Sequence, residues 1–167
     1  SPTPKNITLR LQQFKKYWDN DFRLMLSKAI VTGKIMNCYN IFSEISSLLD
    51  GLGFDPYLAY YHSIDYGRAS LASDLMEEFR APVADRLTLN LVNNRVFGKD
   101  DFYSNPNEGV YLRREALKRY FVEYEGMLSR EFIQQETKEN TTFRKCFRHQ
   151  AERLASSIQD NKPYIPF

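Results

Sequence analysis

The chain has 167 residues, of which 43% are hydrophobic, 26% charged and 14% aromatic. These values suit a soluble globular domain with a sizeable core, and they exclude an intrinsically disordered chain. The formal net charge is only +2, so a nucleic-acid partner is neither required nor excluded, because a basic patch can lie within a nearly neutral total. Neither a signal peptide nor an apolar run long enough to span a bilayer is recognisable. We therefore expect a soluble, cytoplasmic protein without membrane contact.

The first third of the chain has a helical pattern of apolar residues. Two prolines among the first four residues predict a linker over residues 1–6, and residues 7–167 then form one helical domain. Apolar residues recur at spacings of three and four over residues 7–40, where Gly33 could end or bend the helix. A second helical stretch is expected over residues 41–49, since an Asp-Gly pair follows it.

The rest of the chain is also dominated by helical patterns. Ser70 can cap a helix over residues 71–79, and Pro82 is expected to interrupt or kink this helix. The later segments expected to be helical are residues 83–94, 112–135 and 142–158, with an extended tail at residues 161–167. Neither an internal repeat nor a strand-like alternation is recognisable. We therefore expect an all-α fold with multiple helices.

The residues with the clearest chemical potential lie between His62 and Arg80. Asp74 and Glu77 are three apart on an expected helix, so they share one face. His62 precedes this helix by a loop that is long enough to fold the imidazole back over it. One imidazole and two carboxylates suit Mn²⁺ or Mg²⁺ with open water positions, and such an ion could polarise a phosphodiester. Arg80, on the same face, could hold a phosphate beside the ion.

The same residues also have a plainer interpretation. A D-x-x-E-E run such as the one that starts at Asp74 is most often a solvated helix face. A single histidine among aromatic residues, such as His62, is most often a packed side chain with a satisfied hydrogen bond. Considered alone, these residues leave both a metal site and an ordinary helix surface open.

A longer pattern surrounds these residues. The segment from Gly53 to Asn93 contains GFDPY, then a histidine, then GRASLASDLMEEFRAPVADR. It strongly resembles the signature of the CRISPR-associated integrase family, the first of the CRISPR-associated proteins. The likeness extends more loosely to residues 28–35 and to the tail at Pro163 and Tyr164, so it covers most of the chain. It implies the helical catalytic domain of that family.

The resemblance implies a function and a site. In that family the histidine that falls on His62 and the acidic residue that falls on Glu77 are metal ligands. The acidic residue that falls on Asp74 belongs to the same site. The implied enzyme is a metal-dependent DNA endonuclease and integrase that uses Mg²⁺ or Mn²⁺. It inserts new spacers into a CRISPR array by attack of a 3′-hydroxyl on a phosphodiester of the repeat.

The resemblance also implies partners. These are double-stranded DNA, a second copy of the chain in a homodimer, and the small second CRISPR-associated protein as a bridging subunit. Basic residues within and after the signature are the candidate phosphate contacts, namely Arg68, Arg80, Arg86, Arg95 and Lys99. The aromatic residues of the segment 54–61 and of the tail are candidate contact surfaces with protein partners.

The chain departs from the family pattern in two ways. A further glutamate ligand of the family lies in a motif upstream of the signature, and this motif is not found here; Glu44 does not match it. We expect either an omitted segment near residues 37–43 or a deletion there, and we favour an omission. We also expect that the family's β-rich N-terminal domain is absent from this chain. If the glutamate is truly lost, the alternative function is a non-catalytic DNA-positioning subunit or domain of the same integration complex.

Overall fold

The computed structural model describes residues 4–63, 67–105, 109–135 and 138–167, with side chains from residue 7 onward. The helices are α1 (Pro4–Tyr17), α2 (Asn20–Gly51), α3 (Ser70–Phe79), the π-helical η1 (Arg80–Asp85), α4 (Arg86–Asn93), the 3₁₀ turn η2 (Lys99–Asp101), α5 (Arg114–Ser129) and α6 (Phe143–Asp160). The strands are β1 (Phe102–Asn105), β2 (Gly109–Leu112), β3 (Phe132–Ile133) and β4 (Asn140–Thr141). The expected all-α, multi-helix fold is confirmed, with two short antiparallel ribbons, β1–β2 and β3–β4, added to it.

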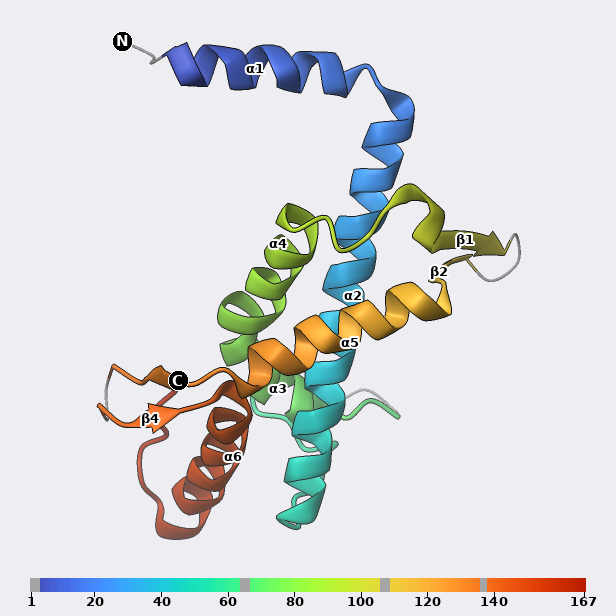
Figure 1. Ribbon diagram of the computed structural model, residues 1–167. Coiled ribbons are helices and arrows are strands. Elements are labelled where there is room, and N and C mark those ends of the chain that lie inside the picture. Colours follow the sequence, from blue (N-terminus) through green and yellow to red (C-terminus); the bar gives the residue numbers. More distant parts are fainter. Residues whose placement is uncertain (1–3, 64–66, 106–108, 136–137) are drawn as a thin grey trace.

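The long helix α2 organises the fold. Its 32 residues span about 48 Å at roughly 1.5 Å per residue. Figure 1 shows α2 running down the molecule, with α1 leaving its upper end and α5 crossing it. The buried residues of α2 recur every fourth position, and they are Ala29, Gly33, Asn37, Ile41, Ile45 and Leu49. One stripe of α2 therefore supports the other helices.

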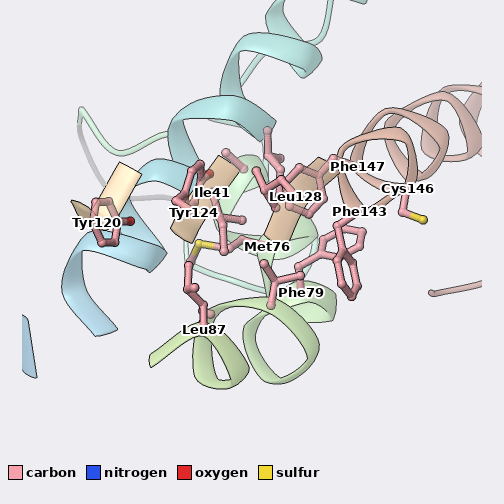
Figure 2. Packing of buried hydrophobic residues seen from close by; sticks show 14 of the residues in the cluster. Ile41, Met76, Phe79, Leu87, Tyr120, Tyr124, Leu128, Phe143, Cys146 and Phe147 are labelled. Carbon is pink, nitrogen blue, oxygen red and sulfur yellow. The ribbon is translucent and has the colours of Figure 1, made fainter. Parts of the chain in front are cut away.

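The core fixes the position of α3, the helix that bears the candidate site. Phe79 of α3 packs edge-on against Phe147 of α6, with 4.6 Å between the ring centroids, and both rings are fully buried. Figure 2 shows these rings together with Leu128 of α5 and Phe143 of α6. Burial of one such side chain contributes roughly 1.5–3 kcal/mol. The apolar face of α3 is thereby held against the bundle, which leaves its polar face for chemistry.

The chain changes its winding directly after α3. Pro82 was expected to interrupt or kink the helix, and the structure confirms this as the six-residue π-helical turn η1. The Ala84 carbonyl accepts hydrogen bonds from Asn37 Nδ2 of α2 at 3.0 Å and from Thr88 Oγ1 of α4 at 2.8 Å. The bond from Asn37 attaches the turn that follows the candidate site to α2, and the bond from Thr88 joins it to α4.

Gly33 was expected to end or bend its helix, and the expectation that the helix ends there is wrong. α2 continues through this position. A Cβ atom at Gly33 would lie 3.4 Å from Leu91 Cδ1 and 3.7 Å from Thr88 Cγ2 of α4. The glycine therefore allows the close approach of α2 and α4, while the many apolar contacts of α2 outweigh its low helix propensity.

The break in the N-terminal helical region lies earlier, after Tyr17. The Asp19 carboxylate accepts a hydrogen bond from Phe22 N at 3.0 Å and caps the start of α2. This cap overrides an apolar pattern that continues across it. α1 begins at Pro4, inside the expected linker, since proline is tolerated in the first turn of a helix. Residues 1–3 of that linker lie outside the described residues.

Two further boundaries differ from expectation. The stretches expected at 7–40 and 41–49 meet in one helix, since residues 37–43 lie within α2. The omitted segment expected near residues 37–43 stays a prediction. α5 ends at Ser129 because the residues that follow pair in the β3–β4 ribbon. None of the helices that the structure describes is both long enough and apolar enough to cross a membrane.

Candidate functional site

The loop between α2 and α3 carries His62 back over α3. The Pro56 carbonyl accepts a hydrogen bond from Leu71 N at 3.0 Å. The Ser63 carbonyl accepts one from Ser70 Oγ, also at 3.0 Å. Both bonds join the loop to the first turn of α3. The expected return of His62 to this helix is therefore observed.

The Asp74 carboxylate accepts hydrogen bonds from the end of this loop. Its Oδ2 accepts hydrogen bonds from the backbone N–H groups of Tyr60 at 2.6 Å and Tyr61 at 3.0 Å. Its Oδ1 accepts from the His62 backbone N–H at 2.9 Å and lies 2.7 Å from His62 Nδ1. Burial by itself raises the pKa of Asp74, but the hydrogen bonds from His62 and the backbone outweigh it and hold the pKa below its usual value. Asp74 is thus an anion at neutral pH.

Glu77 lies one turn further along the same face of α3. Its Oε1 is 3.6 Å from His62 Nε2 and 3.0 Å from Arg80 Nη2. The His62 side chain is 19% exposed and that of Glu77 is 36% exposed, so solvent reaches the pair. The structure therefore brings His62, Asp74, Glu77 and Arg80 together, and we call these four residues the His62 cluster.

Glu78 faces a different part of the molecule from Glu77. Its carboxylate accepts hydrogen bonds from Gln150 Nε2 at 2.7 Å, from the Tyr164 hydroxyl and from Phe167 N. Burial, reinforced by the Glu78 carboxylate, raises the pKa of Tyr164, so the phenol stays protonated as a donor. Glu78 anchors the C-terminal tail. That tail, expected as a contact surface for partners, is held against the body of the chain.

Two atoms of the His62 cluster, His62 Nε2 and Glu77 Oε1, are placed so that one cation could bind both. The 3.6 Å between His62 Nε2 and Glu77 Oε1 is too long for a hydrogen bond. Mg²⁺ is often bound through one or two protein carboxylates and keeps several waters. Within the ranges that the structure describes, no three His, Cys, Asp or Glu side chains form a group that could hold a metal. His62 Nε2 and Glu77 Oε1 fit a divalent ion as two members of its coordination shell, with waters in the other positions.

Glu44 is engaged elsewhere. Arg144 donates to it from Nε at 3.0 Å and from Nη2 at 3.1 Å, and the Tyr124 hydroxyl donates at 2.9 Å. Arg144 also pairs with Glu125 at 2.9 Å. Burial, with the Glu44 carboxylate beside it, raises the pKa of Tyr124. These groups join α2, α5 and α6, which gives Glu44 a structural role.

The five candidate DNA contacts lie in different environments. Arg80 is bound to Glu77. Lys99 Nζ lies 2.7 Å from Asp21 Oδ2, and this hydrogen bond raises the pKa of Lys99. The other three are exposed and lie before α3, on α4 and after α4, and they are Arg68, Arg86 and Arg95. The basic residues are thus distributed over several elements.

One cavity borders α3, and another borders α4. The smaller, of about 320 Å³, adjoins the His62 cluster and is lined by Asp74, Tyr60 and mostly apolar residues of α3 and α6. The larger, of about 610 Å³, lies between α4, α5 and the β3–β4 ribbon, with Arg86 in its wall. We assign the site to the His62 cluster because the groups that can bind cations and phosphates converge there.

Two features of the cluster were not predicted from the sequence. One is the set of backbone N–H groups of residues 60–62 that donate to Asp74. Backbone donors leave no side-chain pattern, so no signal could have revealed them. The other is the pairing of Arg80 with Glu77, which their spacing of three on a helix could have indicated.

Comparisons with known proteins identify relatives of the chain. The family model described as CRISPR associated protein Cas1 matches residues 40–126, which include the His62 cluster. CRISPR-associated endonuclease Cas1 1 of Moorella thermoacetica is 34% identical over 128 residues, which cover 76% of this chain and 37% of that protein. CRISPR-associated endonuclease Cas1 3 of Thermus thermophilus is 38% identical over 126 residues, which cover 74% of this chain and 37% of that protein. The chain spans little more than a third of the length of these relatives.

Solved structures share the fold. A casposase bound to integration product matches with a TM-score of 0.68 and 20% identity, over 83% of this chain and 38% of that chain. A chain of a Cas6-RT-Cas1–Cas2 complex matches with a TM-score of 0.60 and 22% identity, over 83% of this chain and 14% of that chain. At sequence identities this low, the structural matches establish only a shared fold. The family model, in contrast, matches more than half of the 167 residues. The chain therefore belongs to the CRISPR-associated protein Cas1 family.

Proposed function

We propose that this chain is the catalytic domain of a DNA endonuclease and integrase that inserts new spacers into a CRISPR array. Its membership of the Cas1 family and the endonuclease names of its relatives support this function. The structurally similar casposase is bound to an integration product. At the level of residues, the proposal depends on one observation: His62 Nε2 and Glu77 Oε1 lie 3.6 Å apart, accessible to solvent and beside Arg80.

The proposed chemistry is phosphodiester transesterification. A Mg²⁺ or Mn²⁺ ion held by His62 and Glu77 would supply Lewis acidity and neutralise charge on the phosphate. Arg80 is placed to bind a non-bridging phosphate oxygen beside them. The 3′-oxygen of the incoming DNA forms a bond to phosphorus, the bond to the 3′-oxygen of the cleaved strand breaks, and that oxygen takes up a proton. Because one phosphodiester forms as another breaks, the reaction needs no energy source.

Removal of a proposed ligand tests this function. With Glu77→Gln or His62→Ala, we expect strand transfer to fall by more than about 100-fold, while DNA binding is retained. Glu115→Gln is the matched control, because Glu115 is an exposed carboxylate on α5 that pairs only with the surface cation Lys118 among its described contacts. Normal strand transfer by Glu77→Gln with Mg²⁺ or Mn²⁺ present would overturn the assignment.

Double-stranded DNA is the proposed ligand, bound mainly through its phosphates. With a net charge of only +2, the chain needs a local basic surface for this. Arg68, Arg86 and Arg95 are exposed candidates. Release of counterions should weaken binding steeply between roughly 50 and 200 mM salt, and each phosphate contact removed should lower the salt slope by about one. An affinity that stays flat with salt would contradict phosphate-based binding.

A second candidate function is DNA positioning without catalysis. One observation favours it: the Arg80 guanidinium contacts the Glu77 oxygen that would bind the ion. Isothermal titration with Mn²⁺ separates the two functions. Binding that His62→Ala abolishes supports the enzyme. DNA binding without any Mn²⁺ binding, and integration unaffected by Glu77→Gln, supports the positioning domain.

The proposed enzyme acts as part of an assembly. Insertion of a short duplex requires one attack at each of its ends, and the His62 cluster provides a single site per chain. We therefore extend the proposal to a homodimer bridged by the small second CRISPR-associated protein. The match to a chain of a Cas6-RT-Cas1–Cas2 complex supports the small second protein as a partner.

A further inference from the structure

We propose that Asp74 is a positioning residue rather than a metal ligand: its carboxylate fixes the ring orientation and the tautomer of His62, so that an unprotonated Nε2 faces Glu77. This inference rests on the proposed function only in assigning Nε2 the role of a metal ligand. The tautomer itself is a property of the chain without metal or DNA, and it can be measured separately.

The acceptor capacity of Asp74 supports this role. A carboxylate has about four lone-pair positions in its plane, two on each oxygen. Oδ2 accepts from Tyr60 N and Tyr61 N, and Oδ1 accepts from both His62 N and His62 Nδ1, at distances from 2.6 to 3.0 Å. All four positions are occupied. Asp74 could bind a cation only by releasing one of these donors, which would loosen the loop or the imidazole.

The hydrogen bond to Nδ1 determines which nitrogen of the His62 ring is protonated. Oδ2 accepts from two backbone N–H groups and Oδ1 from a third, so the Asp74 carboxylate serves as an acceptor on both oxygens and Nδ1 is the donor of the 2.7 Å hydrogen bond. In the neutral ring Nε2 then keeps its lone pair. That lone pair lies 3.6 Å from Glu77 Oε1, too far for a hydrogen bond. Two acceptors that face each other at this separation are poised for a shared cation.

The backbone bonds to Asp74 have a second effect on His62. Three consecutive N–H groups, those of residues 60–62, converge on one carboxylate. This arrangement fixes the backbone at His62 as well as its ring, and the Tyr61 ring adds an edge contact to the imidazole at 5.2 Å between centroids. Residues that hold a metal-binding histidine in this way commonly alter metal affinity by 10- to 100-fold when removed. Asp74 therefore acts on a ligand through hydrogen bonds.

The substitution Asp74→Asn tests the tautomer directly. If the Asn amide group took the Oδ2 position, its N–H donors would face the two N–H donors of Tyr60 and Tyr61. If it takes the Oδ1 position, it opposes only one backbone donor, that of His62, and can donate to Nδ1. The second arrangement has fewer conflicts, and it requires the proton to move to Nε2. We therefore expect Asp74→Asn to reverse the His62 tautomer.

The measurement is long-range ¹⁵N–¹H NMR of the histidine side chains in the metal-free chain, at a pH where both are neutral. The chain has two histidines, so His149 serves as an internal reference. We expect Nδ1–H at His62 in the wild type, Nε2–H in Asp74→Asn, and Mn²⁺ affinity weakened about tenfold or more in that variant. Glu78→Gln is the matched control. It changes a carboxylate on the same helix that accepts three hydrogen bonds from elsewhere, and it should alter neither quantity.

The outcomes separate this inference from the proposed function. An Nε2–H tautomer at His62 of the wild-type chain overturns the positioning role, whatever the variants do and whether or not they fold. An unchanged tautomer in folded Asp74→Asn, judged by the His149 resonances, also overturns it. If the tautomer reverses as expected but Glu77→Gln integrates DNA normally, the positioning role stands and the proposed catalytic function fails.

Discussion

Three carboxylates within five residues of α3 have three distinct environments. Asp74 accepts four hydrogen bonds from the preceding loop, and Glu77 faces solvent between His62 and Arg80. Glu78 accepts donors from α6 and the tail. Like charges this close destabilise a helix unless each is compensated. The different partners provide that compensation, and they make the three residues separable by mutation.

The bond between Tyr164 and Glu78 should stabilise the tail. Tyr164→Phe removes a hydroxyl that donates to a carboxylate, so we expect the free energy of unfolding to fall by about 1–2 kcal/mol, since hydrogen bonds to charged groups are stronger than neutral ones. Chemical denaturation measures this change. Tyr39→Phe is the control, because Tyr39 is 69% exposed and should change the free energy of unfolding by less than about 0.5 kcal/mol. Equal effects of the two substitutions would refute the anchoring role of Glu78.

Helix α5 contains a glycine whose cost can be measured. Gly126 lies inside the helix, and a Cβ added there would meet nothing within 4 Å. Since glycine in a helix interior costs about 1 kcal/mol relative to alanine, we expect Gly126→Ala to raise the free energy of unfolding by about 0.5–1 kcal/mol. Thermal unfolding checks this.

Gly109 provides the opposite case. It begins β2 with a φ of +106°, a conformation that side chains rarely adopt. Gly109→Ala should therefore lower the melting temperature although the added Cβ also has open space. Stabilisation by both substitutions would show that free space alone, and not backbone conformation, decides the outcome.

The contact between α5 and α6 should depend on pH. The hydrogen bond from Arg144 holds the pKa of Glu125 below its usual 4.5 against the opposing effect of burial. A depressed folded-state pKa contributes stability that is present above the unfolded pKa and is lost as pH falls through the folded value. Because the Glu125 side chain is 55% exposed, we expect only about 0.5 kcal/mol near neutral pH.

The comparison of Glu125→Gln with the wild type at several pH values tests this. The difference in the free energy of unfolding should be constant near neutrality and shrink progressively below about pH 4.5. Glu115→Gln, also on α5, removes the same charge without affecting Arg144. A difference for Glu125→Gln that persists unchanged into strong acid would show that its origin is not ionic.

Sequence patterns predicted the helices better than their ends. Spacings of three and four identified the helical regions, and Pro82 marked the π-helical turn because its missing N–H has a local effect. The break after Tyr17 was missed because apolar spacing continues across it, and only the Asp19 cap marks it. The two ribbons were not predicted, because strands of four and two residues are too short to show an alternation of apolar and polar residues.

The sequence also predicted part of the candidate site, namely the residues that share one helix face and the return of the loop, but not its long-range contacts. Helical spacing alone places Asp74 and Glu77 on one face, and the length of the loop allows His62 to return to them. Local patterns say nothing about the tail that binds Glu78, because its donors come from residues 150–167. Nor do they show that Asp74 accepts three backbone donors in addition to the His62 ring. Contacts between distant segments determine these features, and a single sequence does not record them.

At the scale of the whole molecule, the N-terminal helices present an unusual surface. Figure 1 shows α1 standing away from the bundle. Many large apolar residues are exposed in α1, in the connection to α2 and in the first half of α2, namely Ile7, Leu9, Leu11, Phe14, Trp18, Leu24, Ile30, Val31 and Ile35. Extensive exposed apolar surface on a soluble protein often marks a contact with another polypeptide.

We therefore predict that the chain associates with itself through α1, which would form the homodimer that the proposed insertion at two DNA ends needs. Sedimentation velocity should show a dimer whose fraction rises with concentration, because burial of apolar surface drives the association. Phe14→Glu, which places a charge on a residue that is 66% exposed, should shift the chain toward monomer. Leu89→Glu is the control, since Leu89 is similarly exposed at 61% but lies on α4. A chain that stays monomeric at every concentration, with and without DNA, would refute self-association. Dimers that Leu89→Glu disrupts and Phe14→Glu leaves intact would move the interface from α1 to α4.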